Sequence, residues 1–440
     1  MKITFCINTT KFELEYVKLL FHYMAINFVC KEHEILVFVE NDTDTKAIQT
    51  FLLSQKSIFP NLKIIINPLP IPVGYANNIN MLFEMASHNT VSYLQADMCP
   101  GPCYDAEVIK SLEKFENNVV LSSTRIEPDL HPPSPEKITQ NFGIFPEEIL
   151  SNLQRFNEYV NSKKDYNKIT DFFFAPFTIK DKNKWIDIGG HDTLFRRSRE
   201  DSDILYRMTM LGYAIKQCWN SIVYHRSCVS SRGNNFFSKE GNERAQLQQV
   251  ADRIEMYRFL RKWGSFKHDV KFDPEKEYKY HISTNFYHAT PADVEFLQQY
   301  YPYYHIYIDD IPTRELVRAA FKQLHAPANK LFNISDEQWN YYQKYYRTWQ
   351  WNDIYTESPI INDDIIYDID LRDEQFKQWA KSSYYMPDKT LIHEYRNEPP
   401  GEFELEGTSI KIKINRVVNH IQENIVVKNP PINDIPFVIL

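Results

Sequence analysis

Two polar residues at the ends of apolar segments could bind a divalent cation. Asp97 ends the segment YLQAD at 93–97, and His225 ends the segment SIVYH at 221–225. Both segments read as buried strands followed by a polar residue. A hard cation such as Mn²⁺ or Mg²⁺ prefers oxygen ligands, accepts phosphate oxygens of a substrate, and can take a neutral imidazole. We therefore predict a metal site at Asp97 and His225; the alternatives are a turn-capping acid and an ordinary strand-end histidine.

A second set of candidate residues surrounds two adjacent glycines. Gly189 and Gly190 lack a Cβ, so their backbone can approach a sugar or a diphosphate closely. Glu200 and Asp201 open a predicted helix, where a carboxylate could accept a proton or could simply favour the positive end of the helix. Asp192, Glu200 and Asp201 are the candidates for a general base.

The elements that must position these residues alternate between strands and helices over the first 230 residues. This alternation predicts an α/β fold, a Rossmann-like and mostly parallel sheet covered by helices, in which ligands bind beyond the carboxyl ends of the strands. Strands are predicted at 2–7, 34–39, 62–66, 90–94, 119–123 and 221–225. Helices are predicted at 12–27, 74–86 and 104–115, with a further polar helix at 145–162.

The alternation stops at two places. Residues 124–168 include the loop signal HPPSP and predict an insertion over the site. A predicted helix at 250–266 closes the first domain, and the elements beyond it are short. We therefore predict one domain at 1–265 and a C-terminal α+β appendage at 266–440.

Composition narrows the classes of partner. The chain has 440 residues, 43% hydrophobic and 25% charged, which is ordinary for a globular protein. Its net charge of −8 argues against a large nucleic-acid interface, because such an interface needs a basic face. A local basic patch is still compatible with this charge. Six cysteines are too few for a disulfide scaffold. With no long apolar stretch and no signal peptide, we expect no membrane span and a location in the cytoplasm.

The order of the motifs resembles the GT-A fold of family 2 glycosyltransferases over about residues 1–265. The strand-end acid, the two glycines, the paired acids at a helix start and the final histidine follow one another as in that family. The segments that carry the resemblance are INT at 7–9, VENDTD at 39–44, GYANNIN at 74–80, QAD at 95–97, WIDIGGHD at 185–192, EDSD at 200–203 and YH at 224–225.

Carried over by position, the resemblance assigns roles. It implies that Asp97, as the last residue of a DxD-like motif, and His225 bind the metal, and that Asp201 is the general base of an inverting transfer. Gln95 stands where the family has the first Asp; glutamine can hydrogen-bond a ribose but adds no charge, so metal affinity is expected to fall. The donor contacts expected for this chain are Asn8, Thr9, Glu40, Asn41, Asn77, Gln95, Ala96, Gly189, Gly190, Arg226 and Arg232.

The resemblance implies a metal-dependent, inverting hexosyltransferase that uses a nucleotide-sugar donor, with a UDP-sugar as the first expectation. In such a reaction a cation neutralises the leaving diphosphate and a base takes the proton of the acceptor hydroxyl. The expected acceptor is a glycan or glycoconjugate, and residues 266–440 could bind it or mediate oligomerisation. The alternatives are a weak or inactive sugar-binding or nucleotide-binding module, a transferase acting on modified phage DNA or on protein, and a nucleotidyltransferase.

Overall fold

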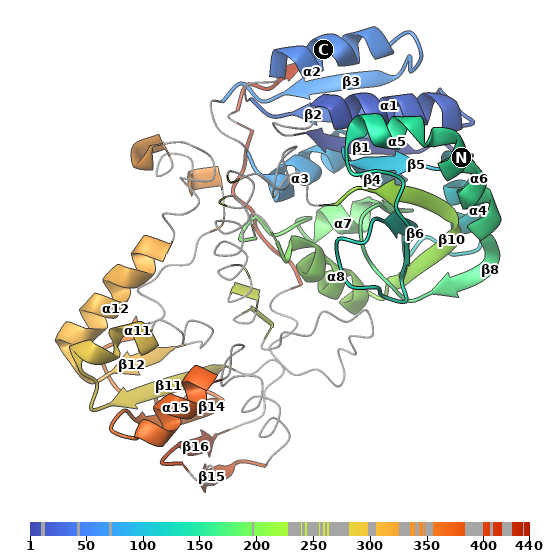
Figure 1. The fold of residues 1–440 in the computed structure, drawn as a ribbon. Helices are drawn as coiled ribbons and strands as arrows, with labels where there is room; N and C mark the ends of the chain where they lie inside the picture. Colours follow the sequence, from blue (N-terminus) through green and yellow to red (C-terminus); the bar gives the residue numbers. More distant parts are fainter. Residues whose placement is uncertain are drawn as a thin grey trace. The chain divides into compact units, whose positions relative to one another are not determined.

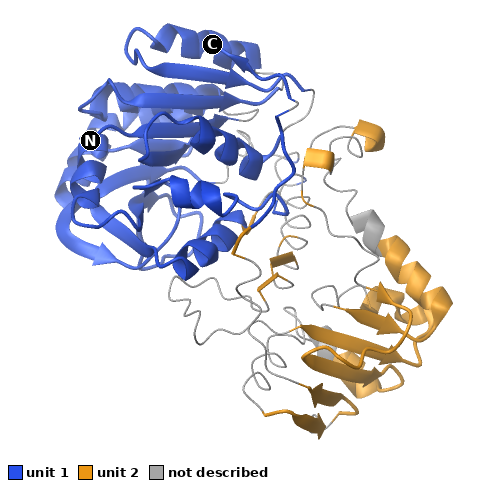
Figure 2. Ribbon diagram, turned by 180° about the vertical axis from the view of Figure 1, so that it is seen from behind, with its two compact units in different colours: residues 1–196, 200–248, 427–440 blue, residues 197–199, 249–426 orange. Residues whose placement is uncertain are grey.

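The computed structural model divides the chain into two compact units, which Figure 2 distinguishes by colour. Unit 1 comprises residues 1–196, 200–248 and 427–440, and unit 2 comprises residues 197–199 and 249–426. The structure describes residues 1–9, 14–41, 45–69, 73–195, 198–227, 239, 243, 255, 258–259, 262–263, 281–297, 305–324, 335–338, 343–345, 347, 355–382, 399–404, 408–415, 425–433 and 435–440.

Unit 1 contains the strands and helices around the candidate residues (Figure 1). Its strands are β1 (Thr4–Thr9), β2 (Glu34–Val39), β3 (Leu62–Ile66), β4 (Val91–Gln95), β5 (Met98–Pro100), β6 (Val119–Glu127), β7 (Lys137–Thr139), β8 (Asp165–Thr170), β9 (Phe177–Ile179), β10 (Ala214–His225) and β17 (Val438–Ile439). Its helices are α1 (Leu14–Asn27), α2 (Thr45–Gln55), α3 (Tyr75–Met85), α4 (Tyr104–Leu112), α5 (Pro146–Ser151), α6 (Leu153–Lys163), α7 (Asn183–Asp187) and α8 (Glu200–Met210).

The sheet of unit 1 has the strand order β17-β3-β2-β1-β4-β9-β6-β10-β5, with β7 beside β6 and β8 beside β10. Strands β3, β2, β1 and β4 are parallel, as are β6 and β10. β9 is antiparallel to both β4 and β6, so these two strands run in the same direction. The predicted mostly parallel α/β fold is confirmed, and the carboxyl ends of its long strands meet at one edge.

The local sequence explains why this sheet forms. The segment EILVFV of β2 is buried at all six positions, as expected for a parallel strand covered on both faces. The antiparallel strands β5, β9 and β17 were not predicted, because each has only two or three residues and such a length carries no periodic signal.

The segment 124–168, predicted as an insertion, contributes to the sheet. β6 continues to Glu127, β7 pairs with it, and β8 pairs with β10. The helices α5 and α6 pack on this part through a small aromatic core in which the ring of Phe156 lies 5.4 Å from Phe142 and 6.1 Å from Tyr224. The residues of the segment therefore support the strands that end at the candidate site.

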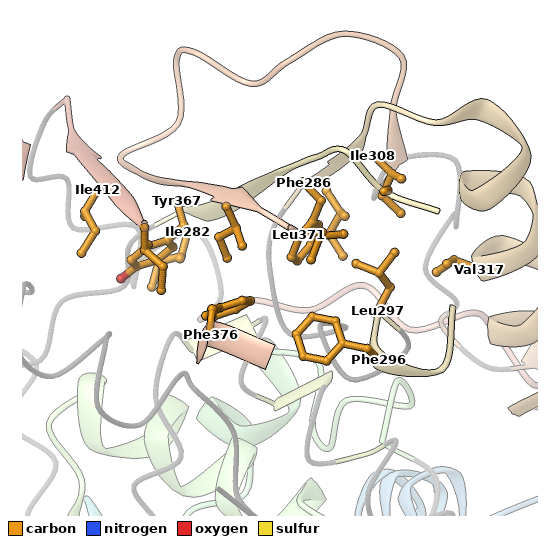
Figure 3. Packing of buried hydrophobic residues seen from close by; sticks show 14 of the residues in the cluster. Ile282, Phe286, Phe296, Leu297, Ile308, Val317, Tyr367, Leu371, Phe376 and Ile412 are labelled. Atoms are coloured by element: carbon orange, nitrogen blue, oxygen red, sulfur yellow. The ribbon is translucent and has the colours of Figure 1, made fainter. Parts of the chain in front are cut away.

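Unit 2 has its own mixed sheet and core, and it corresponds to most of the predicted α+β appendage. Its strand order is β13-β12-β11-β14-β16-β15, parallel from β13 to β14 and antiparallel beyond. Figure 3 shows its core, in which the rings of Phe296 and Phe376 meet edge to face at 5.7 Å. Its strands are β11 (Ile282–Tyr287), β12 (Ile306–Ile308), β13 (Tyr355–Thr356), β14 (Ile365–Asp370), β15 (Gly401–Glu404) and β16 (Lys411–Ile414). Its helical segments are η1 (Pro291–Asp293), α11 (Val294–Leu297), α12 (Ile311–Leu324), η2 (Gln343–Tyr345) and α15 (Glu374–Ser382).

The division between the units differs from the predicted boundary at 265/266. The contacts divide the chain at 248/249, and the last residues, 427–440, return to unit 1. There β17 pairs antiparallel with β3. Of the helix predicted at 250–266, only five residues lie within the described part. Among the described residues no helix is long and apolar enough to cross a membrane.

Candidate functional site

Asp97 and His225 lie beside each other at the carboxyl edge of the unit 1 sheet. Asp97 occupies the turn between β4 and β5, and His225 is the last residue of β10. β5 pairs with the end of β10 so that Met98 lies opposite His225, which brings Asp97 next to the imidazole. Nε2 of His225 lies 3.8 Å from Oδ2 of Asp97, too far for a direct hydrogen bond. The structure therefore brings the two predicted metal ligands together.

Glu127, the last residue of β6, fixes the orientation of the His225 ring. Its Oε1 lies 2.8 Å from Nδ1 of His225. Burial alone would raise the pKa of Glu127, but the hydrogen bond from His225, the charge of Arg125 and the hydrogen bond from Lys137 outweigh burial and hold that pKa well below its ordinary range. An ionised carboxylate only accepts hydrogen bonds, so Nδ1 carries a proton, and Nε2 is the ring nitrogen that faces Asp97.

Glu127 was missed in the sequence, although a signal for it exists. The predicted strand ended at residue 123 because polar residues follow, whereas the observed β6 is buried at all nine positions up to Glu127. A strand extended through TRIE would have placed this acid at the same edge as Asp97, because β4 and β6 run in the same direction.

Arg125 connects the metal-site candidates with the start of α8. Its Nη1 donates to Oε1 of Glu127 at 2.8 Å, and its guanidinium lies 3.6 Å from the ring centroid of Phe174. Burial lowers the pKa of Arg125, and the charges of Glu127 and Asp201 oppose that shift. Asp201 therefore acts electrostatically on the same buried cation that pairs with Glu127. The ring of Phe174 is also 6.3 Å from that of His225.

The acidic residues predicted as general-base candidates differ in burial. Asp192 is fully buried, Glu200 is 8% exposed, and Asp201 is only partly buried. The neighbouring Asp203 is fully buried and accepts a hydrogen bond from Nε of Arg207 at 2.9 Å, so its carboxylate is used within the fold. Of these acids, Asp201 is the most exposed residue, and its Oδ1 accepts a hydrogen bond from the backbone of Ser202 at 2.7 Å.

Gly189 and Gly190 are required by the protein's own packing. Both have left-handed backbone angles, with φ of +84° and +60°. A Cβ on Gly189 would lie 2.1 Å from the carbonyl oxygen of Val427, and one on Gly190 would lie 2.5 Å from Oδ1 of Asn80. The close approach predicted for a ligand is thus made by other segments of the chain, and contact of the glycines with a donor sugar stays a prediction.

Glu40, which follows β2, is enclosed by neutral hydrogen-bond donors. Its Oε1 accepts from Nδ2 of Asn78 at 2.8 Å and from the backbone of Val73 at 3.0 Å, and its Oε2 accepts from Nδ2 of Asn67 at 2.7 Å. Burial raises the pKa of Glu40 to about 7, although each of these hydrogen bonds by itself lowers that pKa. The carboxylate joins β2 to the start of α3, and its predicted contact with the nucleotide stays a prediction.

The other predicted donor contacts from the strands lie along the same edge. Asn8 and Gln95 are opposite each other in the register of β1 and β4, and both are partly buried. The hydroxyl of Thr9 is buried and has no hydrogen-bond partner within the described part of the chain. Asn77 donates to a backbone carbonyl in the preceding turn at 3.0 Å. Ala96 directly follows β4, and Asn41 is the second residue after β2.

The two arginines predicted to contact phosphate have different outcomes. Arg226 is fully buried, with Nε donating to the carbonyl of Ile144 at 3.0 Å and Nη1 donating to the carbonyl of Ser227 at 2.8 Å. It therefore holds backbone segments beside the site. Arg232 lies outside the described residues.

The pair of Asp97 and His225 fits a divalent cation. Metal–oxygen and metal–nitrogen distances of about 2.1 Å allow two ligand atoms to lie up to about 4 Å apart, and the observed separation is 3.8 Å. Among the described residues no group of three or more His, Cys, Asp or Glu side chains could hold a metal ion. A cation bound here could also accept water and the phosphate oxygens of a substrate as ligands.

No protein-family model and no curated protein sequence matches the chain. Similar solved structures include GalNAc-T7 with UDP, GalNAc and Mn²⁺, at 12% identity and a TM-score of 0.39, covering 59% of this chain and 50% of that chain. Another is TarS 1-349 of S. aureus with UDP-GlcNAc, at 14% identity and a TM-score of 0.37, covering 79% of this chain and 93% of that chain. A third is the mannosyltransferase PcManGT from Pyrobaculum calidifontis with GDP-Man and Mn²⁺, at 13% identity and a TM-score of 0.40, covering 78% of this chain and 83% of that chain. The chain therefore spans half the length of GalNAc-T7. Because all three are distant, we infer function from the site residues.

Proposed function

We propose that this chain is a metal-dependent glycosyltransferase of the GT-A type that uses a nucleotide-sugar donor, with a UDP-sugar as the expected donor. The observation that carries the proposal is the approach of Asp97 to His225, 3.8 Å apart at the carboxyl edge of the parallel strands. Open α/β sheets bind their ligands at that edge. Glu127 adds support, because its bond to Nδ1 of His225 leaves Nε2 as the ring nitrogen that could bind a metal beside Asp97.

The chemistry of a sugar transfer divides among the residues of this edge. Asp97 and His225 would hold Mn²⁺ or Mg²⁺, which when bound supplies positive charge against which the diphosphate leaves. Asp201, at the start of α8, would accept the proton of the acceptor hydroxyl. The hydroxyl oxygen bonds to the anomeric carbon while the bond from that carbon to the diphosphate breaks, and attack from the opposite face inverts the centre.

Gln95 favours a second candidate function, a module that binds a nucleotide sugar with little turnover. It lies at the end of β4, two residues before Asp97, and brings no charge to the site. For the transferase itself the expected acceptor is a glycan or glycoconjugate. The net charge of −8 makes a nucleic-acid acceptor the lesser alternative.

Thermal melting with nucleotides tests the proposal. Wild type is melted with UDP, GDP and CDP, each with and without Mn²⁺, beside Asp97→Asn and the control Asp129→Asn, which changes an exposed acid. We expect UDP with Mn²⁺ to raise the melting temperature of wild type and of the control, because a ligand that binds only the folded state stabilises it. Asp97→Asn should lose the part of the shift that depends on Mn²⁺. The absence of a shift with any nucleotide would contradict the proposal.

Release of UDP from UDP-sugars then separates the two candidates. A transferase should release UDP in the presence of Mn²⁺, and Asp97→Asn should not. A melting shift without any UDP release, with glycan acceptors supplied, would favour the binding module.

A further inference from the structure

The segment 427–429, here called the strap, lies against the loop of residues 188–193. The backbone N–H of Val427 donates to the carbonyl of Ile188 at 3.0 Å. Asn429 makes four more hydrogen bonds to the loop. Its Nδ2 donates to the carbonyls of Gly189 and His191 at 2.6 and 2.8 Å, and its Oδ1 accepts from N and Oγ1 of Thr193, each at 3.0 Å. One side chain thus holds three residues of this loop.

The loop is shaped to receive the strap. Gly189 has φ of +84°, and a Cβ there would lie 2.1 Å from the carbonyl oxygen of Val427. That distance is far shorter than any Cβ contact, so only glycine allows the strap to lie where it does.

The same loop is held from two other sides. Nη1 of Arg207 donates to the carbonyl of Ile188 at 3.0 Å, and Nη2 donates to the carbonyl of Gly190. Asn80 of α3 exchanges two hydrogen bonds with the backbone of His191, at 2.8 and 2.9 Å. Arg207 is itself a buried residue of α8, paired with Asp203. The loop therefore lies between the strap and the helix that begins with Glu200 and Asp201.

We infer that the strap is a positioning element of the proposed active site and that Asn429 is its positioning residue. Asn429 sets the backbone of 189–193, and this backbone, through its bonds to Arg207, sets the first turn of α8 and with it Asp201. The inference rests on the proposed function. Because the strap follows unit 2 in the chain, unit 1 completes this loop only after unit 2 has been synthesised.

Hydrogen exchange and kinetics of Asn429→Ala test the inference in the full chain. The matched control is Asn433→Ala, which removes an exposed asparagine four residues further along. We expect amides of 188–193 to exchange at least about tenfold faster in Asn429→Ala, since the loop loses four bonds. The kcat for UDP-sugar turnover should fall about 100-fold, as for a misplaced catalytic group, with Kd for UDP and Mn²⁺ within about threefold of wild type.

A second variant protects the test against misfolding. Asn429→Asp keeps the size of the side chain and the acceptor for Thr193 but turns an oxygen toward the carbonyls of Gly189 and His191, so it should match or exceed Asn429→Ala in both faster exchange and loss of kcat. Unchanged exchange in both variants, or faster exchange with unchanged kcat, would overturn the inference. If wild type neither binds UDP with Mn²⁺ nor turns over a UDP-sugar, the proposed function fails. The exchange data would then still test whether the hydrogen bonds of Asn429 order the loop 188–193.

Discussion

Two buried glutamates follow or end strands at the same edge of the unit 1 sheet, and their partners differ in charge. Glu127 at the end of β6 is paired with Arg125 and Lys137 and accepts a bond from His225. Glu40 after β2 accepts bonds only from amide groups of side chains and backbone among its described partners. The pKa of Glu127 is lowered and that of Glu40 is raised, to about 7.

We interpret the difference as a division of the edge into two parts. The part around Glu127 can interact with charged ligands, and the part around Glu40 belongs to the packing of the fold. Cations around Glu127 keep it ionised, and its charge in turn polarises His225 beside Asp97. The donors around Glu40 are neutral, so burial outweighs them and disfavours the ionised carboxylate. The same donors connect Asn67, Val73 and Asn78 to the end of β2. We therefore expect substitutions near Glu127 to change catalysis and substitution of Glu40 to change stability.

The largest expected effect is that of Asp201→Asn at the Glu127 part of the edge. Asparagine cannot accept a proton, so kcat for UDP-sugar transfer should fall about 10²- to 10⁴-fold. Binding of UDP with Mn²⁺, measured by calorimetry, should stay near that of wild type. Glu200→Gln and Asp192→Asn are the comparison variants, and both should keep more of the activity. A greater loss in either of them would move the general base away from Asp201.

The next effect is that of Glu127→Gln, compared with Glu40→Gln as its matched control. The amide of the new glutamine can donate as well as accept, so it no longer fixes the proton on Nδ1 of His225. The affinity for Mn²⁺ in the presence of UDP should therefore fall about 10- to 100-fold. Glu40→Gln should change that affinity by less than about threefold. Isothermal titration with Mn²⁺ at fixed UDP measures both values. Equal losses in the two variants would remove the distinction between the two parts of the edge.

Sequence periodicity predicted the strands that are long and apolar. The ranges 34–39 and 62–66 match β2 and β3, and the helix predicted at 74–86 differs from α3 by one residue at each end. Asp97 and His225 were placed at the ends of strands from their local sequence, and their joint role as metal ligands came from the resemblance. These features depend on local sequence, whereas the approach of Asp97 to His225 also requires β5, which was not predicted.

Features that depend on contacts between distant segments were not predictable in this way. The return of 427–440 to unit 1 depends on Asn429 and on a two-residue strand, neither of which has a periodic signal. Glu127 was missed because polar residues inside a buried strand resemble a loop in sequence. The glycines at 189 and 190 were interpreted as a ligand site, since the sequence alone does not show that Val427 packs there.

Glu40→Gln is expected to have the smallest effect on the binding of UDP with Mn²⁺. Its effect should instead be on the free energy of unfolding. The folded pKa of Glu40, about 7, lies above its ordinary value of 4.5. Its contribution to the free energy of unfolding is therefore fully present below about pH 4.5 and is lost as the pH rises through about 7. The change amounts to roughly 3 kcal/mol if the whole shift is realised. Glu40→Gln is neutral at every pH, like the protonated acid, so urea unfolding of wild type and variant should show their smallest difference near pH 5 and their largest at pH 8, where wild type has lost this contribution.

The same variant tests whether Glu40 also contacts the donor. If Glu40 acts only within the fold, the stability of the variant relative to wild type depends on pH, while its affinity for UDP with Mn²⁺ changes little at either pH. If its carboxylate binds the nucleotide, the affinity falls about tenfold or more, as expected when a charged hydrogen bond is removed. The first result is expected, because the described donors already occupy both oxygens of Glu40.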